Sequence, residues 1–331
     1  MDYNQNLKAL RNSIRDLKVD VLFLGMHNAF GNYNNSLSDI QFFSGFSGSN
    51  GRAVISQEKA TLAVDGRYIK QAKEQTDEKL WSIESYPKTN TSKLIEQLIH
   101  PGQVLGVCVY SLSYRSYLVI LELSKRLNFG IKLISNFPII TRTLLTTKVS
   151  ILSEKDTGES IHSRVKKIQN KLANDEVLLI TDSSMIGCIS GLRLIKTTTE
   201  QNIIPIAVLL ITKNNKPILL CDLRIDNENN DFEVKLISEF KTIIVQQSFK
   251  IAKLNFATTP LYFPYLLQSM DFTVIDDSIS YQHLYSIKND TEITHQKHGA
   301  ILTSLAMIEV LAVTEQGLIS SELEAVEMFY K

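Results

Sequence analysis

The fold of this chain is decided by residues 39–75, which read DIQFFSGFSGSNGRAVISQEKATLAVDGRYIKQAKEQ. Three glycines, Gly45, Gly48 and Gly51, lie three residues apart among serines and an asparagine. Glycine takes up positive φ angles and close backbone approaches that other residues avoid, and serine and asparagine are typical of turns. We therefore predict a loop of specialised backbone conformation at this point.

Two short apolar runs follow the glycines, at residues 53–55 and 60–64. The polar residues 56–59 separate them. Two apolar runs joined by a short polar connection are typical of a β-hairpin with buried strands. The sequence therefore predicts a hairpin directly after the glycine-rich loop.

The second predicted strand ends at a junction with a helix. Asp65 and Gly66 close the apolar run, and residues 67–75 change to a helical pattern in which Asp65 is a plausible N-cap. The junction places the cation Arg67 in the first turn of a helix at the end of a strand, where α/β sheets commonly bind ligands. The residues alone also fit a well-turned hairpin without a ligand, and that simpler interpretation stays open.

Two linked motifs in this stretch carry a resemblance. The first is F-x-S-G-F-x-G-S-x-G-x-x-x-I at residues 42–55, and the second is V-D-G-R-Y-I-x-Q-A at residues 64–72. Together they resemble the N-terminal domain of aminopeptidase P, the Xaa-Pro aminopeptidases of the creatinase-like pita-bread metallopeptidases. The resemblance implies an α/β fold of two tandem creatinase N-terminal-like domains, with mixed sheets flanked by helices, followed by the first helices of a pita-bread domain.

The resemblance also implies roles for residues of the two motifs. In cytosolic relatives the arginine of D-G-R-Y reaches the substrate pocket, which makes Arg67 the candidate substrate-binding residue. A guanidinium suits a carboxylate or a peptide carbonyl through its fixed fork of donors. The alternative is that Arg67 only pairs with a nearby carboxylate. The expected scaffold around it consists of Gly45, Gly48, Gly51, Asp65, Gly66 and Tyr68.

The predicted elements divide the chain into three parts. Apolar strands alternate with helices through residues 1–148 and again through 149–285, which is typical of α/β domains. The resemblance makes these creatinase-like domains I and II. Residues 286–331 contain two predicted helices, and the resemblance identifies them as the truncated start of the catalytic pita-bread domain.

Some elements of the second unit are predicted from short patterns only. We expect a helix at 234–240 and a strand at 242–246, because the latter is a short apolar run. The lysines of a predicted helix at 163–172 are expected on a solvated face.

Composition argues against several classes of protein. The 331 residues carry 35 Lys and Arg against 35 Asp and Glu, whereas a dedicated nucleic-acid-binding protein usually has a basic excess. No apolar run approaches the about 20 residues of a membrane-spanning helix, and the polar N-terminus is unlike a signal peptide. The cysteines Cys108, Cys188 and Cys221 show no metal-ligand spacing, and two of them, Cys108 and Cys221, read as core residues. We therefore expect a cytoplasmic protein without a nucleic-acid or membrane partner.

The metal chemistry of the family is expected to lie outside this chain. The resemblance implies that an intact member uses two divalent metals, usually Mn(II), to activate a bridging water. The family's ligands follow the first helices of the catalytic domain, so we expect no metal ligand and no catalytic residue here. His295 and His298, spaced i and i+3, are a weak alternative metal motif. Arg193 is similar to an arginine near the family's active-site mouth, although the residues after it depart from the family pattern.

The resemblance implies the N-terminal part of an Xaa-Pro aminopeptidase. An intact member is a homodimer that removes the residue preceding proline from peptides with proline at the second position. We expect this chain alone to be inactive, because it lacks the metal ligands. The alternative is a non-catalytic peptide-binding or dimerisation module that acts with a separately encoded catalytic chain. Apolar side chains of the last segment are expected to lack cover, which marks a missing partner: Ile301, Leu305, Ile308, Leu311 and Met328.

Overall fold

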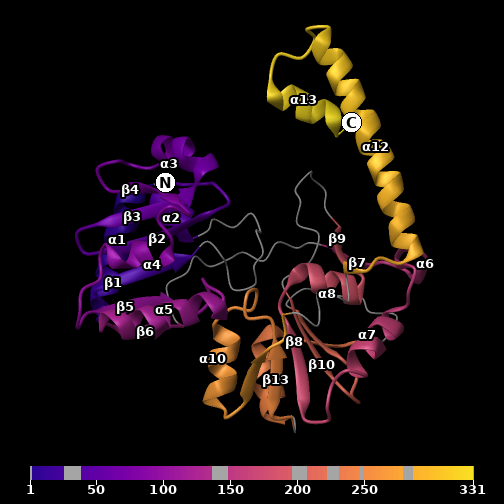
Figure 1. Cartoon of the computed structure of the whole chain (residues 1–331), viewed down its shortest axis with the longest axis horizontal. Helices are drawn as coiled ribbons and strands as arrows, with labels where there is room; N and C mark the ends of the chain where they lie inside the picture. Colours follow the sequence, from indigo (N-terminus) through magenta and orange to yellow (C-terminus); the bar gives the residue numbers. More distant parts are fainter. Residues whose placement is uncertain are drawn as a thin grey trace.

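The computed structural model of the chain contains two units of sheet and helices and a C-terminal pair of helices (Figure 1). The structure describes residues 2–25, 39–135, 148–195, 207–221, 231–246, 249–278 and 286–330. The predicted boundaries near residues 148 and 285 adjoin gaps in this description, and they stay predictions.

The strands are β1 (Val21–Gly25), β2 (Gly51–Ser56), β3 (Ala60–Asp65), β4 (Ser82–Tyr86), β5 (Val104–Cys108), β6 (Gly130–Ile134), β7 (Lys148–Ile151), β8 (Glu176–Ile180), β9 (Leu192–Ile195), β10 (Ala207–Thr212), β11 (Ile218–Cys221), β12 (Glu233–Lys235), β13 (Ile251–Leu254) and β14 (Thr273–Asp276). The α-helices are α1 (Tyr3–Asp16), α2 (Asp39–Ser44), α3 (Ile69–Gln75), α4 (Thr91–Glu96), α5 (Tyr114–Leu127), α6 (Glu154–Thr157), α7 (Ile161–Gln169), α8 (Ser183–Ser190), α9 (Phe240–Gln246), α10 (Tyr262–Ser269), α12 (Asp290–Glu315) and α13 (Glu322–Phe329). Two 3-10 helices are η1 (Gly66–Tyr68) and η2 (Ile237–Glu239).

The first sheet has six strands in the order β4-β3-β2-β1-β5-β6. Strands β2 and β3 pair antiparallel with Val54 opposite Thr61, which confirms the predicted hairpin. Strand β1 is antiparallel to β2 and parallel to β5, so the sheet is mixed, as predicted.

Helices cover both faces of this first sheet. Because side chains alternate along a strand, β2 and β3 bury one set of residues with α1, α2 and α3 and the other set with α4 and α5. Leu62 belongs to the first core and Val54 to the second, and both are fully buried. Helix α2 precedes the glycine-rich loop, and the sequence pattern did not indicate it.

The second sheet repeats the first. Its order is β12-β11-β10-β8-β13-β14. The directions also match: the central pairs β11·β10 and β10·β8 are antiparallel, and the outer pairs are parallel. Helices α7 and α8 cover one face, and α9 and α10 cover the other. Strands β7 and β9 form a separate two-stranded sheet that the sequence did not predict.

One predicted element of the second unit is wrong and another is right only in part. The helix predicted at 234–240 begins instead as the edge strand β12 at 233–235, and only residues 237–240 are helical. Residues 240–246 form helix α9 in place of the strand predicted at 242–246. Phe240, Ile243 and Ile244 are buried at helical spacing against the sheet. A short apolar run fits a buried strand and a buried helix alike, and only packing against the sheet decides between them.

The other predictions for the second unit and for the cysteines agree with the structure. In α7 the lysines Lys166 and Lys167 are exposed, and the Nζ of Lys167 lies 2.6 Å from an Oε of Glu159. Cys108 and Cys221 are buried in the two units, which confirms their assignment to the core.

The two units contact each other where α5 begins. The backbone amide of Tyr114 donates a hydrogen bond to the carbonyl of Thr259 at 2.9 Å. The backbone amide of Arg115 donates one to the carbonyl of Phe256 at 2.8 Å. The guanidinium of Arg115 also reaches the carboxylate of Asp276 at 2.6 Å. Backbone bonds of this kind fix the start of α5 against the loop after β13.

Helix α12 is attached to the second unit through its N-terminus. The side chain of Asn289 accepts a hydrogen bond from the amide of Glu292 and donates one, of 2.8 Å, to the carbonyl of Thr157. Gly158 has a φ of +72°, and a Cβ there would lie 2.7 Å from Asn289 and Thr291. The start of α12 therefore packs directly against the backbone of Gly158, where a larger residue would not fit.

Beyond this attachment α12 is largely uncovered, and Figure 1 shows it extending away from both sheets. Val310 is 9% exposed, and α13 contacts α12. Four predicted apolar side chains are more than half exposed: Ile301, Leu305, Ile308 and Leu311. Met328, in α13, is partly buried, so the expectation for that residue is wrong.

By length and composition alone, α12 could cross a membrane, and no other helix among the described residues could. The most apolar 18 residues of α12 are unburied. The sequence analysis predicted no such helix, because polar residues interrupt every apolar run within it.

Candidate functional site

The site predicted from the sequence forms where β3 ends. The Asp65 carboxylate accepts the backbone N–H of Arg67 at 3.0 Å and so caps η1, which leads directly into α3. This confirms the predicted N-cap, although the first turn is a 3-10 helix.

The Arg67 side chain is exposed, with 74% of its surface accessible. Its Nε donates to the same oxygen of Asp65 at 2.8 Å. This hydrogen bond is the main cause that lowers the pKa of Asp65 from its ordinary value. The geometry shows the local carboxylate pairing, and most of the guanidinium fork still faces solvent.

Tyr68 connects this junction to the glycine-rich loop. Its hydroxyl lies 2.7 Å from the hydroxyl of Ser49. Its ring meets Phe46 edge-on with centroids 5.9 Å apart, and Phe46 is fully buried. The guanidinium carbon of Arg67 lies 5.5 Å from the centroid of the Tyr68 ring. The arginine is therefore held beside a ring that is anchored in the core.

The four glycines of the two motifs have different structural needs. Gly45 has a φ of +84°, a conformation that favours glycine. At Gly48 an added Cβ would lie 2.2 Å from the Phe46 ring. At Gly51 the nearest atom would be 3.4 Å away, and at Gly66 nothing lies within 4 Å. The predicted reasons for glycine therefore hold for Gly45 and Gly48 and not for Gly51, and Gly66 has open space around it.

A second arginine lies in the strands beside this junction, and the sequence analysis missed it. The guanidinium carbon of Arg52, in β2, lies 4.2 Å from the centroid of the Tyr86 ring, in β4. One terminal nitrogen of Arg52 is buried without a hydrogen-bond partner. A buried donor is normally paired, so this nitrogen is one of the exceptions among the described residues. The only signal in the sequence is an arginine next to Gly51 at the start of an apolar strand.

The other sequence candidates do not join this site. His295 and His298 are exposed on α12, and no group of three or more His, Cys, Asp or Glu among the described residues could hold a metal ion. Arg193 donates to the carbonyls of Gly187 and Leu192, its own neighbourhood. The residues that the structure describes therefore do not fit a dinuclear metal centre.

This arrangement offers hydrogen-bond donors to a ligand. Arg67 and Arg52 offer guanidinium donors that suit carboxylates and carbonyls. Asp65, the carboxylate that meets Arg67, is engaged by two of its donors. We derive no hydrolytic step from these residues.

Comparison with known proteins places this geometry in a family. The creatinase/prolidase N-terminal domain matches residues 6–134. The probable Xaa-Pro aminopeptidase P of Paracoccidioides lutzii is 39% identical over 114 residues, and that of Aspergillus niger is 33% identical over 114 residues. Each match covers 32% of this chain and only 18% of the relative, so the chain matches less than a fifth of these proteins.

The fold matches over nearly the whole chain. The X-prolyl aminopeptidase of Caenorhabditis elegans, described as a cytosolic enzyme with a di-nuclear active site, superposes with a TM-score of 0.84 at 19% identity. The match covers 99% of this chain and 59% of that one, and at this identity it shows the fold alone. Residues 6–134 therefore match the creatinase/prolidase N-terminal domain, and about a third of the chain is similar in sequence to Xaa-Pro aminopeptidases P.

Proposed function

We propose that this chain is the non-catalytic part of an Xaa-Pro aminopeptidase, an enzyme that removes the N-terminal residue preceding proline. The observation that carries the proposal is α12, which is anchored at Asn289 and whose section at residues 300–313 is mostly apolar and largely uncovered. A helix that is hydrophobic all round is normally buried. A further part of the protein that surrounds α12 would supply the metal centre that the described residues do not form.

The polar residues of α12 favour a protein partner over a lipid bilayer. Glu309 is exposed in the middle of the apolar section, and Thr303 and Ser304 interrupt it. A charged side chain at the centre of a bilayer costs at least about 2.5 kcal/mol, whereas a protein interior can supply it with a partner. We therefore infer that the covering surface is protein.

In this proposal Arg67, which directly follows β3, contacts the peptide through its exposed donors. Peptides with proline at the second position are the proposed ligands. The proposal includes domains at residues 1–148, 149–285 and 286–331, a cytoplasmic homodimer, and two Mn(II) held by the covering part.

The covering part can be a continuation of the same polypeptide or a separately encoded catalytic chain. The second case corresponds to a non-catalytic peptide-binding or dimerisation module. Both cases predict the same buried surface on α12, and they differ in whether the covering part can be added in trans.

The test is hydrolysis of an Arg-Pro-Pro peptide with Mn(II). We expect no turnover from the 331-residue chain alone. Turnover should appear after addition of a polypeptide that carries the metal-binding part of an Xaa-Pro aminopeptidase P. Leu305→Glu should abolish the gain, whereas Lys297→Glu, at an exposed polar site of the same helix, should leave it unchanged. Turnover by the chain alone would overturn the proposal.

A further inference from the structure

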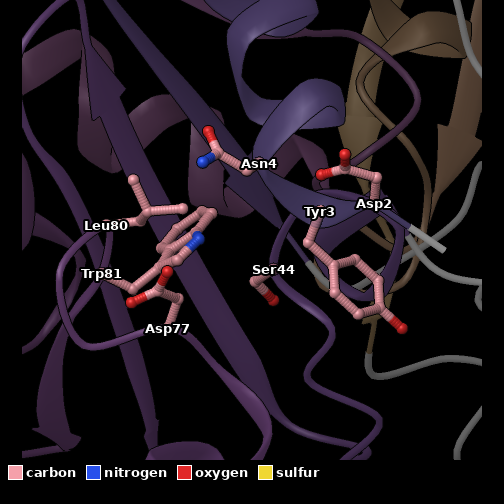
Figure 2. A pocket seen from close by; sticks show the side chains of 7 residues that line it. All are labelled: Asp2, Tyr3, Asn4, Ser44, Asp77, Leu80 and Trp81. Carbon is pink, nitrogen blue, oxygen red and sulfur yellow. The ribbon is translucent and has the colours of Figure 1, made fainter.

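The pocket at the start of α1 does not identify a ligand. It has a volume of about 560 Å³ and is lined by Asp2, Tyr3, Asn4, Ser44, Asp77, Leu80 and Trp81. Figure 2 shows Asp2 and Asp77 on opposite sides of it. Each of these carboxylates accepts the backbone amide of a residue in its own turn, which explains both of them as local caps.

At the start of α12, by contrast, Asn289 has a second contact besides its cap. Its side-chain oxygen accepts the amide of Glu292 at 2.9 Å, and the carboxylate of Glu292 accepts the amide of Asn289 at 3.0 Å. A serine or an aspartate would cap the helix equally well. Asparagine adds an N–H2 group, which donates to the carbonyl of Thr157 at 2.8 Å, 132 positions earlier in the chain. This donor therefore links α12 to the end of α6 and is not needed for the cap.

The loop that receives this bond is held by Arg164, in α7. The guanidinium donates to the hydroxyl of Thr157 at 3.1 Å, to the carbonyl of Glu159 at 2.9 Å and to the carbonyl of Cys188, in α8. Burial is the main cause that lowers the pKa of Arg164, and Glu292 of α12 is among the groups that oppose this shift. The arginine therefore joins the loop to α8 and lies near the first turn of α12.

The buried part of this attachment is the first turn of α12. Asn289, Thr291 and Glu292 are half-buried, whereas residues 293–305 are all exposed. An α-helix rises about 1.5 Å per residue, so the mostly apolar section at residues 300–313 begins roughly 16 Å beyond Asn289. A tilt of about 10° at the first turn would move the start of that section by about 3 Å. The contacts with Thr157 therefore decide where the uncovered section of the helix lies.

We propose that Asn289 is a positioning residue of the assembled enzyme, whose bond to Thr157 fixes the direction in which α12 holds the covering part. This inference rests on the proposed function, in which the covering part carries the metal centre and Arg67, in the first unit, contacts the peptide. In that arrangement the distance between the metal centre and Arg67 depends on how α12 is attached. A misplacement of about 1 Å can lower the rate of a reaction about 10²-fold.

Two substitutions separate the cap from the link. Asn289→Asp and Asn289→Ser keep a capping oxygen for Glu292 and lose the amide N–H that reaches Thr157, and the serine adds no charge. Both variants are assembled with the metal-binding polypeptide and Mn(II), and hydrolysis of the Arg-Pro-Pro peptide is measured. We expect kcat to fall about tenfold in each. The concentration of polypeptide that gives half-maximal activity should stay unchanged, because the exposed apolar side chains of α12 are the same.

The matched controls are Asn90→Asp and Asn90→Ser. Asn90 caps α4 through the amide of Lys93 at 3.0 Å, and its side chain makes no hydrogen bond to another element among the described residues. Both controls should keep the kcat of the unchanged chain. Hydrogen exchange of the amides of residues 293–298, measured on the 331-residue chain without the covering part, should be faster in the Asn289 variants than in the controls.

The outcomes separate this inference from the proposed function. If both Asn289 variants keep the kcat of the unchanged chain and only their Tm falls, Asn289 is merely structural and the inference is wrong. An equal loss of kcat in the Asn90 controls, or unaltered hydrogen exchange in both Asn289 variants, would also overturn it. Absence of turnover when the unchanged chain is assembled with the polypeptide would instead contradict the proposed function.

Discussion

The two six-stranded sheets have the same strand order and the same strand directions, yet they carry different chemistry. In the first sheet β3 ends at Asp65 and leads to an exposed arginine, and a pocket opens beside β4. In the second unit the polar contacts around Thr157 attach α12. The comparison shows that one pattern of buried strands can be used twice, while the residues at strand ends and loops decide what each copy does.

The sequence contains a further sign of this repetition. The first sheet has Asp65, Gly66 and Arg67 after β3, and the second has Asp222, Leu223 and Arg224 after the corresponding strand β11. Residues 222–224 lie outside the described part of the chain, so the comparison at this point is one of sequence only.

The largest expected effect concerns the ring that holds the glycine-rich loop of the first unit. Phe46 is fully buried and contacts both Gly48 and Tyr68. Phe46→Ala should lower the free energy of unfolding by about 3–5 kcal/mol, because it leaves a large cavity. Urea unfolding measures the loss. Phe42→Ala, at a partly buried position, should lower the free energy of unfolding by less. An equal loss in the two variants would show that the full burial of Phe46 does not make it more important for stability than Phe42.

A smaller effect is expected when the same loop is overpacked. Gly48→Ala would place a Cβ 2.2 Å from the Phe46 ring and should cost about 1–3 kcal/mol of unfolding free energy. Gly51→Ala meets only ordinary contacts and should cost nothing measurable. Thermal unfolding of both variants compares the two glycines directly. If both lose the same stability, the close approach at Gly48 is not the reason for glycine there.

The second sheet should respond to acid through a pair on its central strands. Glu176 lies on β8, and its carboxylate meets the Nζ of Lys253, on β13, at 2.8 Å. Burial raises the pKa of Glu176, but the hydrogen bonds from Lys253 and the amide of Ala173 outweigh it, so the net pKa is lowered. A lowered folded-state pKa stabilises the fold above the unfolded value of about 4.3, and this contribution disappears as pH falls through the folded pKa.

Glu176→Gln should therefore cost about 1 kcal/mol of unfolding free energy near neutral pH, and the difference from the unchanged chain should vanish as pH falls through the folded-state pKa. Urea unfolding at several pH values measures this dependence. Glu78→Gln, at an exposed position of the first unit, is the matched control for the substitution itself. A constant difference across the pH range would mean that the pair does not titrate as described.

The smallest effect is expected at the exposed arginine. Arg67→Ala should leave the Tm unchanged, because the pair with Asp65 lies in solvent. The same variant should weaken peptide binding in the assembled enzyme, measured as a rise in KM. A clear loss of stability without a change in KM would instead make Arg67 a structural residue.

Local signals explain which parts of the site could be predicted. The cap at Asp65, the hairpin of β2 and β3 and the positive φ of Gly45 each depend on a few neighbouring residues. The unpaired nitrogen of Arg52 depends on a ring in β4, which no local pattern shows. The pocket of Trp81 joins α1 to the turn before β4, more than seventy residues later in the chain.

The sequence by itself determined most strands of the two large sheets, most helices and the family resemblance, because apolar spacing and turn residues act over short distances. Only the tertiary structure decided that residues 240–246 form a helix, because an apolar run that short gains its conformation from the surface it covers. It also decided that Arg115 meets Asp276 between the units and that α12 is uncovered. Contacts of this kind join segments far apart in the chain, and burial is a property of the whole fold.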